Sequence, residues 1–139
     1  MLYNKENAIT KWQYIRASSQ MQKTDKKRII LIDLDGVLNQ YKGKFDENHI
    51  PKIKPGAKKF IEKLSKEFKI KLFTTRNKIL ASRWLAQNDL DELVCDITNI
   101  KELCWLFIDD RCIQFDGKFK NLHKEISNFK PWYKIKRSR

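Results

Sequence analysis

The sequence contains few of the residues that build disulfide or metal-thiolate frameworks. It has three cysteines, Cys95, Cys104 and Cys112, and two histidines, His49 and His123, among 139 residues. An odd number of cysteines at unremarkable spacing favours reduced thiols in a cytoplasmic protein over a disulfide framework. Because the two histidines are far apart, the sequence gives no support for a zinc site of His and Cys ligands.

Long apolar runs are also missing. No stretch approaches the roughly 20 apolar residues that a membrane-spanning helix needs. The first residues, MLYNKENAITKWQ, lack the apolar core of a secretory signal. We therefore expect a cytoplasmic protein with no membrane partner. Hydrophobic residues make up 41% of the chain, which is sufficient for one globular domain with its own core.

The excess of positive charge is concentrated in the two terminal segments. The formal net charge is +13. Residues 1–28 carry seven basic residues against two acidic ones, and residues 130–139 carry five basic residues and no acidic one. Basic segments attract polyanions, which makes nucleic acid a candidate partner. A lysine-rich composition that serves solubility is the simpler explanation.

The apolar pattern divides the chain into an N-terminal basic extension, residues 1–27, and an α/β domain, residues 28–139, that ends in the basic C-terminal tail. In the extension, Ile9, Trp12 and Ile15 recur at helical spacing, which predicts a short amphipathic helix.

Within the domain, short apolar runs alternate with segments of helical spacing. Strands that alternate with helices indicate a three-layer, Rossmann-like parallel sheet. After the first strand, the segment LNQYKGKF predicts a small hairpin flap. The expected strands are residues 29–32, 70–73, 94–97 and 104–108, and the expected helices follow Gly56, Asn77 and Gly117.

Polar side chains stand at the ends of the predicted strands. Asp33, Thr74 and Asp109 each follow an apolar run, and functional groups gather at the carboxyl ends of parallel strands. Asp35 and Asp110 add two more carboxylates close by in sequence. Bringing these charges together is costly unless a cation is present. Oxygen ligands suit Mg²⁺, which binds one or two carboxylates, water and a substrate phosphate.

This set of side chains suits phosphoryl transfer. One aspartate can form an acyl-phosphate, and a second can protonate the leaving alcohol and then activate water. Hydroxyl, backbone N–H and lysine groups can bind the oxygens of the transferring phosphoryl group.

Several segments, in this order, resemble the motifs of the haloacid dehalogenase (HAD) superfamily. ILIDLDGVLN resembles the first motif, a hydrophobic strand followed by Asp-x-Asp-Gly-(Thr/Val)-Leu. KLFTTRN resembles the second, a strand that ends in Thr or Ser, and WLFIDDR resembles the fourth, a strand that ends in paired acids. Lys101 stands where some small members carry the lysine of the third motif. The order and spacing agree over residues 28–116.

The resemblance implies a role for each matching acidic residue. Asp33 would be the nucleophile and a ligand of Mg²⁺. Asp35 would be the general acid and base, and its carbonyl oxygen would bind the metal. Asp109 would bind the metal, and Asp110 would support it directly or through water.

The resemblance also assigns the remaining candidate residues. Thr74, with Thr75 as its rival, would bind the substrate phosphate, and Lys101 would neutralise it. Four further residues are candidates for substrate specificity, although arginines at such positions are more often surface or ion-pair residues. They are Asn39 and Tyr41 on the flap, and Arg76 and Arg111 beside the second and fourth motifs.

The spacing leaves no room for a large cap domain, because only residues 36–54 separate Asp35 from Pro55. The expected function is therefore that of a capless, Mg²⁺-dependent phosphomonoester hydrolase. Its phosphorylated substrate would be a nucleotide, a nucleic-acid end phosphate or a sugar phosphate. The alternatives are a non-catalytic HAD-like module that binds nucleic acid and a phosphotransferase.

Overall fold

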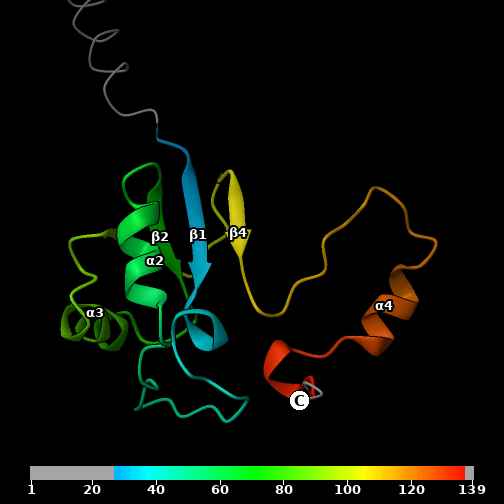
Figure 1. Ribbon diagram of the computed structural model, residues 1–139, viewed down its shortest axis with the longest axis horizontal. Helices are drawn as coiled ribbons and strands as arrows, with labels where there is room; N and C mark the ends of the chain where they lie inside the picture. The colour runs from blue at the N-terminus through cyan, green and yellow to red at the C-terminus, as the bar shows by residue number, and fades with distance from the viewer. Residues whose placement is uncertain (1–26, 137–139) are drawn as a thin grey trace, which may run out of the picture.

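A sheet of four parallel strands forms the centre of the computed structural model, which describes residues 27–136 (Figure 1). The α/β class and the parallel sheet are therefore confirmed. The helix predicted in the N-terminal extension lies outside the described residues. In their order across the sheet, the strands are β3 (Val94–Thr98), β2 (Lys69–Phe73), β1 (Ile29–Asp33) and β4 (Leu106–Ile108).

β1 lies between β2 and β4 because its side chains tolerate complete burial. Ile30, Leu31 and Ile32 are each no more than 1% exposed. A central parallel strand is covered on both faces, so it needs such an unbroken apolar run. The parallel register pairs Asp33 with Phe73, which brings the carboxyl ends of β1 and β2 to the same edge.

Two helices, α2 (Ala57–Leu64) and α3 (Lys78–Gln87), pack on one face of the sheet. Ile61 of α2 and Trp84 of α3 belong to the same core cluster as Leu72 of β2. The steps from β1 to β2 and from β2 to β3 run in one direction across the sheet. Right-handed crossovers therefore place both helices on the same face.

The opposite face of the sheet carries Leu31, together with the rings of Phe73 and Phe107, whose centroids lie 4.8 Å apart. Within residues 27–136, the two helices that pack on the sheet, α2 and α3, lie on the other face. The last helix, α4 (Leu122–Asn128), buries no residue. The third layer expected from the sequence is thus not formed within the described part of the chain. None of the helices there is long and apolar enough to cross a membrane.

The hairpin predicted after β1 is wrong. β1 is followed by a tight turn, η1 (Leu34–Leu38), and then by residues 40–52, all described, which form no strand. One antiparallel bridge between Asn39 and Ile53 closes this 40–52 loop. The loop has no alternating apolar side chains that could bury one face of a hairpin, so its backbone remains irregular.

The segment after β4 leaves the sheet and returns near the end of the described chain (Figure 1). There the short helix η2 (Trp132–Lys134) contacts the turn after β1, where Trp132 Nε1 donates a hydrogen bond of 2.7 Å to the Gly36 carbonyl. Trp132 therefore packs the end of the described chain onto the domain. Trp105 is 52% exposed and stacks on Phe68.

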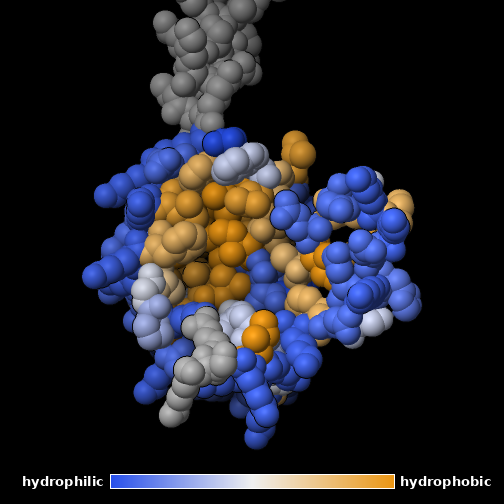
Figure 2. Space-filling model, turned by 45° about the vertical axis from the view of Figure 1, so that its right-hand side comes forward, coloured by the Kyte–Doolittle hydropathy of each residue, from blue (hydrophilic) through white to orange (hydrophobic). Residues whose placement is uncertain are grey.

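An apolar patch remains open on the same side of the sheet as α2 (Figure 2). Phe60 of α2 and Leu106 of β4 are among the exposed large apolar side chains of the described residues. The patch remains open because the segment after β4 projects away from the strand instead of covering it.

Candidate active site

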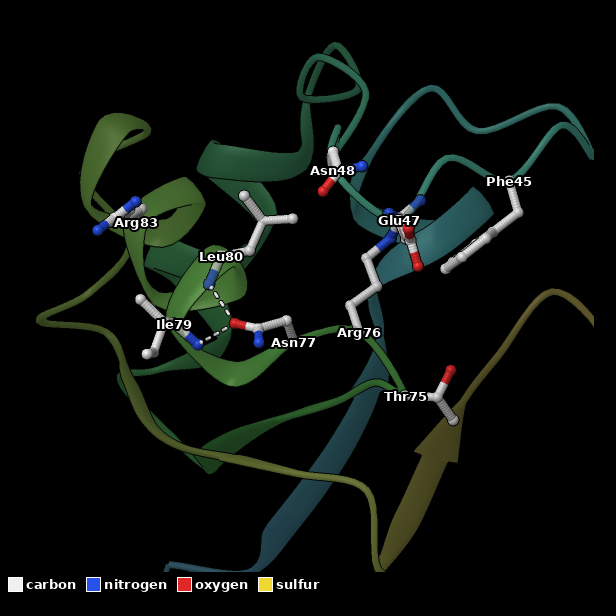
Figure 3. A pocket seen from close by; sticks show the side chains of 9 residues that line it. All are labelled: Phe45, Glu47, Asn48, Thr75, Arg76, Asn77, Ile79, Leu80 and Arg83. Atoms are coloured by element: carbon white, nitrogen blue, oxygen red, sulfur yellow. Dashed lines mark hydrogen bonds between the residues drawn. The ribbon is translucent and has the colours of Figure 1, made fainter.

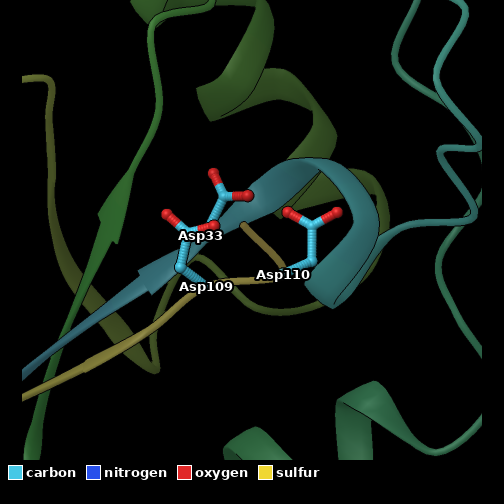
Figure 4. Close-up of side chains that lie close together, drawn as sticks. All are labelled: Asp33, Asp109 and Asp110. Carbon is cyan, nitrogen blue, oxygen red and sulfur yellow. The ribbon is translucent and has the colours of Figure 1, made fainter. Parts of the chain in front are cut away.

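Three carboxylates meet at the carboxyl edge of the sheet. Asp33 ends β1, and Asp109 and Asp110 directly follow the neighbouring strand β4. One carboxylate oxygen from each residue lies within 4.8 Å of those of the other two (Figure 4). The structure therefore brings together three of the four aspartates that the sequence places at this edge. We call these three residues the acidic cluster.

The acidic cluster carries unfavourable charge in the absence of a cation. Burial, followed by the negative charges of Asp109 and Asp110, raises the pKa of Asp33 to about 8, although a hydrogen bond from the Leu34 backbone opposes this. Burial also raises the pKa of Asp110, whose Oδ2 is buried without a hydrogen-bond partner among the described residues. An all-oxygen set with an unpartnered oxygen fits a hard cation such as Mg²⁺.

Gly36 leaves the space that the Asp110 carboxylate occupies. Its φ is +83°, and a Cβ atom at this position would collide with that carboxylate. We expect Gly36→Ala to lower the free energy of unfolding by about 3 kcal/mol, through backbone strain and the collision together. Gly56 is the matched control, because its φ is +87° and a Cβ there would meet nothing within 4 Å.

Urea unfolding of the two glycine variants would measure the difference. Gly56→Ala is expected to cost only about 1 kcal/mol, which is the strain of the left-handed backbone. Equal losses in the two variants would show that the Asp110 carboxylate does not lie against Gly36.

Asp35 is held outside the acidic cluster by two donors. Its Oδ1 accepts a hydrogen bond of 2.9 Å from Asn39 Nδ2, and its Oδ2 accepts one of 2.7 Å from Arg76 Nε. Asn39 is fully buried, and its Oδ1 also accepts hydrogen bonds from the backbone of Gly36 and Tyr41. Asn39 therefore positions Asp35 and the turn, and its role in substrate specificity remains a prediction.

Arg76 connects Asp35 to the 40–52 loop. Its side chain is 1% exposed, and its Nη1 donates hydrogen bonds to the carbonyls of Asp46 at 2.6 Å and His49 at 3.1 Å. The guanidinium also lies 4.5 Å from the centroid of the Phe45 ring. Arg76, which was expected to flank the site, is therefore buried and forms an ion pair with Asp35, the proposed acid and base.

The predicted phosphate ligands are in different environments. Thr74 is buried, its backbone N–H donates to the Thr98 carbonyl, and its Oγ1 accepts a hydrogen bond from the Arg76 backbone. Thr75 is exposed. Lys101 is exposed in the connection between β3 and β4, and no hydrogen bond or ion pair joins it to the acidic cluster within residues 27–136. Its role in phosphate binding remains a prediction.

Tyr41 and Arg111 meet through Tyr133, which was not predicted as a site residue. The Arg111 guanidinium donates a hydrogen bond of 2.8 Å to the Tyr133 hydroxyl, and the Tyr41 and Tyr133 rings meet edge to face at 6.3 Å. The backbone N–H of Arg111 also donates to Asp109 Oδ1 at 2.8 Å. The last described turn of the chain therefore lies beside Tyr41, which follows the first motif, and Arg111, which ends the fourth.

A cavity of about 790 Å³ opens between the 40–52 loop and α3 (Figure 3). Thr75 and Arg76 form part of its wall, next to Phe45 of the loop and Arg83 of α3. Phe45 and Arg83 were not predicted as site residues. No sequence pattern could identify them, because they line the same cavity only through the fold of an irregular loop.

The comparisons with known proteins give no relative. No family model, no curated protein and no solved structure matches the chain.

Proposed function

We propose that this chain is an Mg²⁺-dependent phosphomonoester hydrolase of the HAD type, with Asp33 as the nucleophile. The convergence of Asp33, Asp109 and Asp110 within 4.8 Å at the carboxyl edge of a parallel sheet carries the proposal. The ordered motifs of the sequence, which resemble those of the HAD superfamily, support it. Asp33 ends the inner strand β1, where it is paired with Phe73 of β2.

In the first half of the reaction, a carboxylate oxygen of Asp33 attacks phosphorus, and the bond from phosphorus to the leaving oxygen breaks. The leaving oxygen takes a proton from Asp35, which Asn39 and Arg76 hold in one orientation. In the second half, water attacks the phosphorus of the aspartyl-phosphate, and Asp35 takes the proton that the water loses. Asp33 and inorganic phosphate are released.

Three carboxylates of this chain would hold the metal: those of Asp33, Asp109 and Asp110. When bound, Mg²⁺ supplies positive charge that offsets the repulsion between an anionic nucleophile and an anionic phosphate. Thr75 and the backbone N–H groups of the turn after Asp33 are the candidate donors to the phosphoryl oxygens.

Phosphate release from a panel of phosphomonoesters tests the proposal. The panel holds nucleotides, oligonucleotides phosphorylated at either end, sugar phosphates and a phosphopeptide. We expect release that requires Mg²⁺ and falls at least about a hundredfold in chelator, because the acidic cluster repels the substrate without a cation. Equal release with and without chelator would contradict the metal assignment. Formation of a new phosphoester when glycerol is added would identify a phosphotransferase instead.

A further inference from the structure

The cavity beside Arg76 is a separate feature from the acidic cluster. Its walls come from the 40–52 loop, from the residues after β2 and from the first two turns of α3 (Figure 3). Its volume of about 790 Å³ lies within the range of roughly 300–1,000 Å³ that is typical of small-molecule sites. A phosphoryl group alone would leave most of this space unfilled.

Arg76 links the cavity to the group that would protonate the leaving oxygen. Its Nε donates to Asp35, and the residue forms part of the cavity wall. In the proposed reaction the leaving oxygen takes its proton from Asp35. Because Arg76 both contacts Asp35 and lines the cavity, the organic group attached to that oxygen would extend toward Arg76 and into the cavity. On this geometry, the cavity holds the part of the substrate that leaves as the alcohol.

The cavity wall offers an aromatic surface beside cationic groups. Phe45 is 56% exposed, and the Arg76 guanidinium lies 4.5 Å from the ring centroid. Arg83 is exposed and has no hydrogen bond or ion pair within residues 27–136. Its charge is available to an anion.

We infer that the cavity binds the nucleoside part of a phosphorylated nucleoside, with the base stacked on Phe45. Stacking on an exposed aromatic side chain is a common way to hold a base without selecting its sequence. Arg83 then faces a further phosphate where the nucleoside belongs to an oligonucleotide. This inference rests on the proposed function, since Asp35 defines which end of the substrate enters the cavity.

Steady-state kinetics with the full chain and Mg²⁺ test this inference. The substrates are nucleoside 5′- and 3′-monophosphates, oligonucleotides phosphorylated at either end, and glycerol phosphate, which lacks a base. We expect the best nucleoside substrate to exceed glycerol phosphate in kcat/KM by at least about tenfold. Phe45→Ala is expected to lower that ratio about tenfold, and Phe45→Trp to retain it. Phe119→Ala, at an exposed aromatic residue of the segment after β4, is the control and should leave the ratio unchanged.

The two sources of a phosphorylated nucleoside give different results with Arg83→Gln. A preference for oligonucleotides that this variant removes identifies a nucleic-acid end as the substrate. Equal rates for oligonucleotides and mononucleotides, unaffected by the variant, identify a free nucleotide. If neither Phe45→Ala nor Arg83→Gln changes the ratio of kcat/KM between the best nucleoside substrate and glycerol phosphate, the inference is overturned. The proposed function is then left intact.

A binding measurement separates failure of the inference from failure of the proposed function. A nucleoside monophosphate that carries a fluorescent N-methylanthraniloyl group is titrated with the full chain, and anisotropy reports binding without turnover. If no compound releases phosphate but the probe binds and Phe45→Ala weakens binding about tenfold, the cavity assignment stands and the hydrolase proposal fails. If the probe does not bind and the chain hydrolyses glycerol phosphate as fast as any nucleotide, the cavity assignment fails alone.

Discussion

Replacing Asp33 with asparagine is expected to lower phosphate release by at least about 10⁴-fold, because an amide cannot form the acyl-phosphate. The panel substrate with the highest kcat/KM is the one to use, and far-ultraviolet circular dichroism would confirm that the fold is retained. The control is Asp91→Asn, which changes an exposed aspartate outside the acidic cluster and should leave turnover unaltered. Substantial turnover by Asp33→Asn would exclude Asp33 as the nucleophile.

The same substitution is expected to stabilise the metal-free protein at alkaline pH. In the folded chain the pKa of Asp33 is raised to about 8 from an ordinary value of 3.8, so protonation of its carboxyl favours the folded state. That contribution is complete below about pH 4 and is lost as the pH rises through about 8.

Urea unfolding in chelator at pH 5, 7 and 9 measures this effect. At pH 9 the wild type should be less stable than Asp33→Asn by about 2 kcal/mol, a value reduced from the full pKa difference because the site is partly solvated. This difference in the free energy of unfolding should become smaller toward pH 5. Mg²⁺ should stabilise the wild type more than the variant. Parallel stability curves for the two proteins would contradict the raised pKa of Asp33.

The acidic cluster was predictable because two local patterns place its members. An unbroken apolar run such as Ile29 to Ile32 suits a covered strand, and it stops at Asp33. The second run stops at Asp109, and parallel strands bring their carboxyl ends to one edge whatever their order in the sheet. The start of α3 was predictable for a similar local reason, since Asn77 Oδ1 accepts hydrogen bonds from Ile79 and Leu80.

The rest of the site depends on contacts between segments that carry no periodic signal. Arg76 is buried because carbonyls of the 40–52 loop, about 30 residues away in sequence, accept its hydrogen bonds. The start of this loop, residues 38–45, was expected to be a hairpin, but the only pairing in the described chain there is the bridge from Asn39 to Ile53. Side-chain hydrophobicity alone also does not place Trp105, which stacks on Phe68 at the surface.

Arg76→Ala is expected to be the most destabilising single change in the site, with a loss of about 3–5 kcal/mol in the free energy of unfolding. The substitution removes a buried cation from a partly buried carboxylate, since the side chains of Arg76 and Asp35 are 1% and 19% exposed. It also removes the donor for two loop carbonyls. Arg83→Ala is the control for stability and should cost less than about 0.5 kcal/mol, because Arg83 is exposed.

Turnover should fall about a hundredfold or more in Arg76→Ala, since Asp35 loses the donor that fixes its orientation. Arg76→Lys keeps the charge but not the planar fork, so it should recover stability only in part. A double-mutant cycle with Asp35→Asn separates the contributions. If Arg76 acts on turnover through Asp35, Arg76→Ala should cause little further loss of turnover in the Asp35→Asn background. Independent, multiplicative losses would show that Arg76 contacts the substrate directly, which would make it a catalytic residue in its own right.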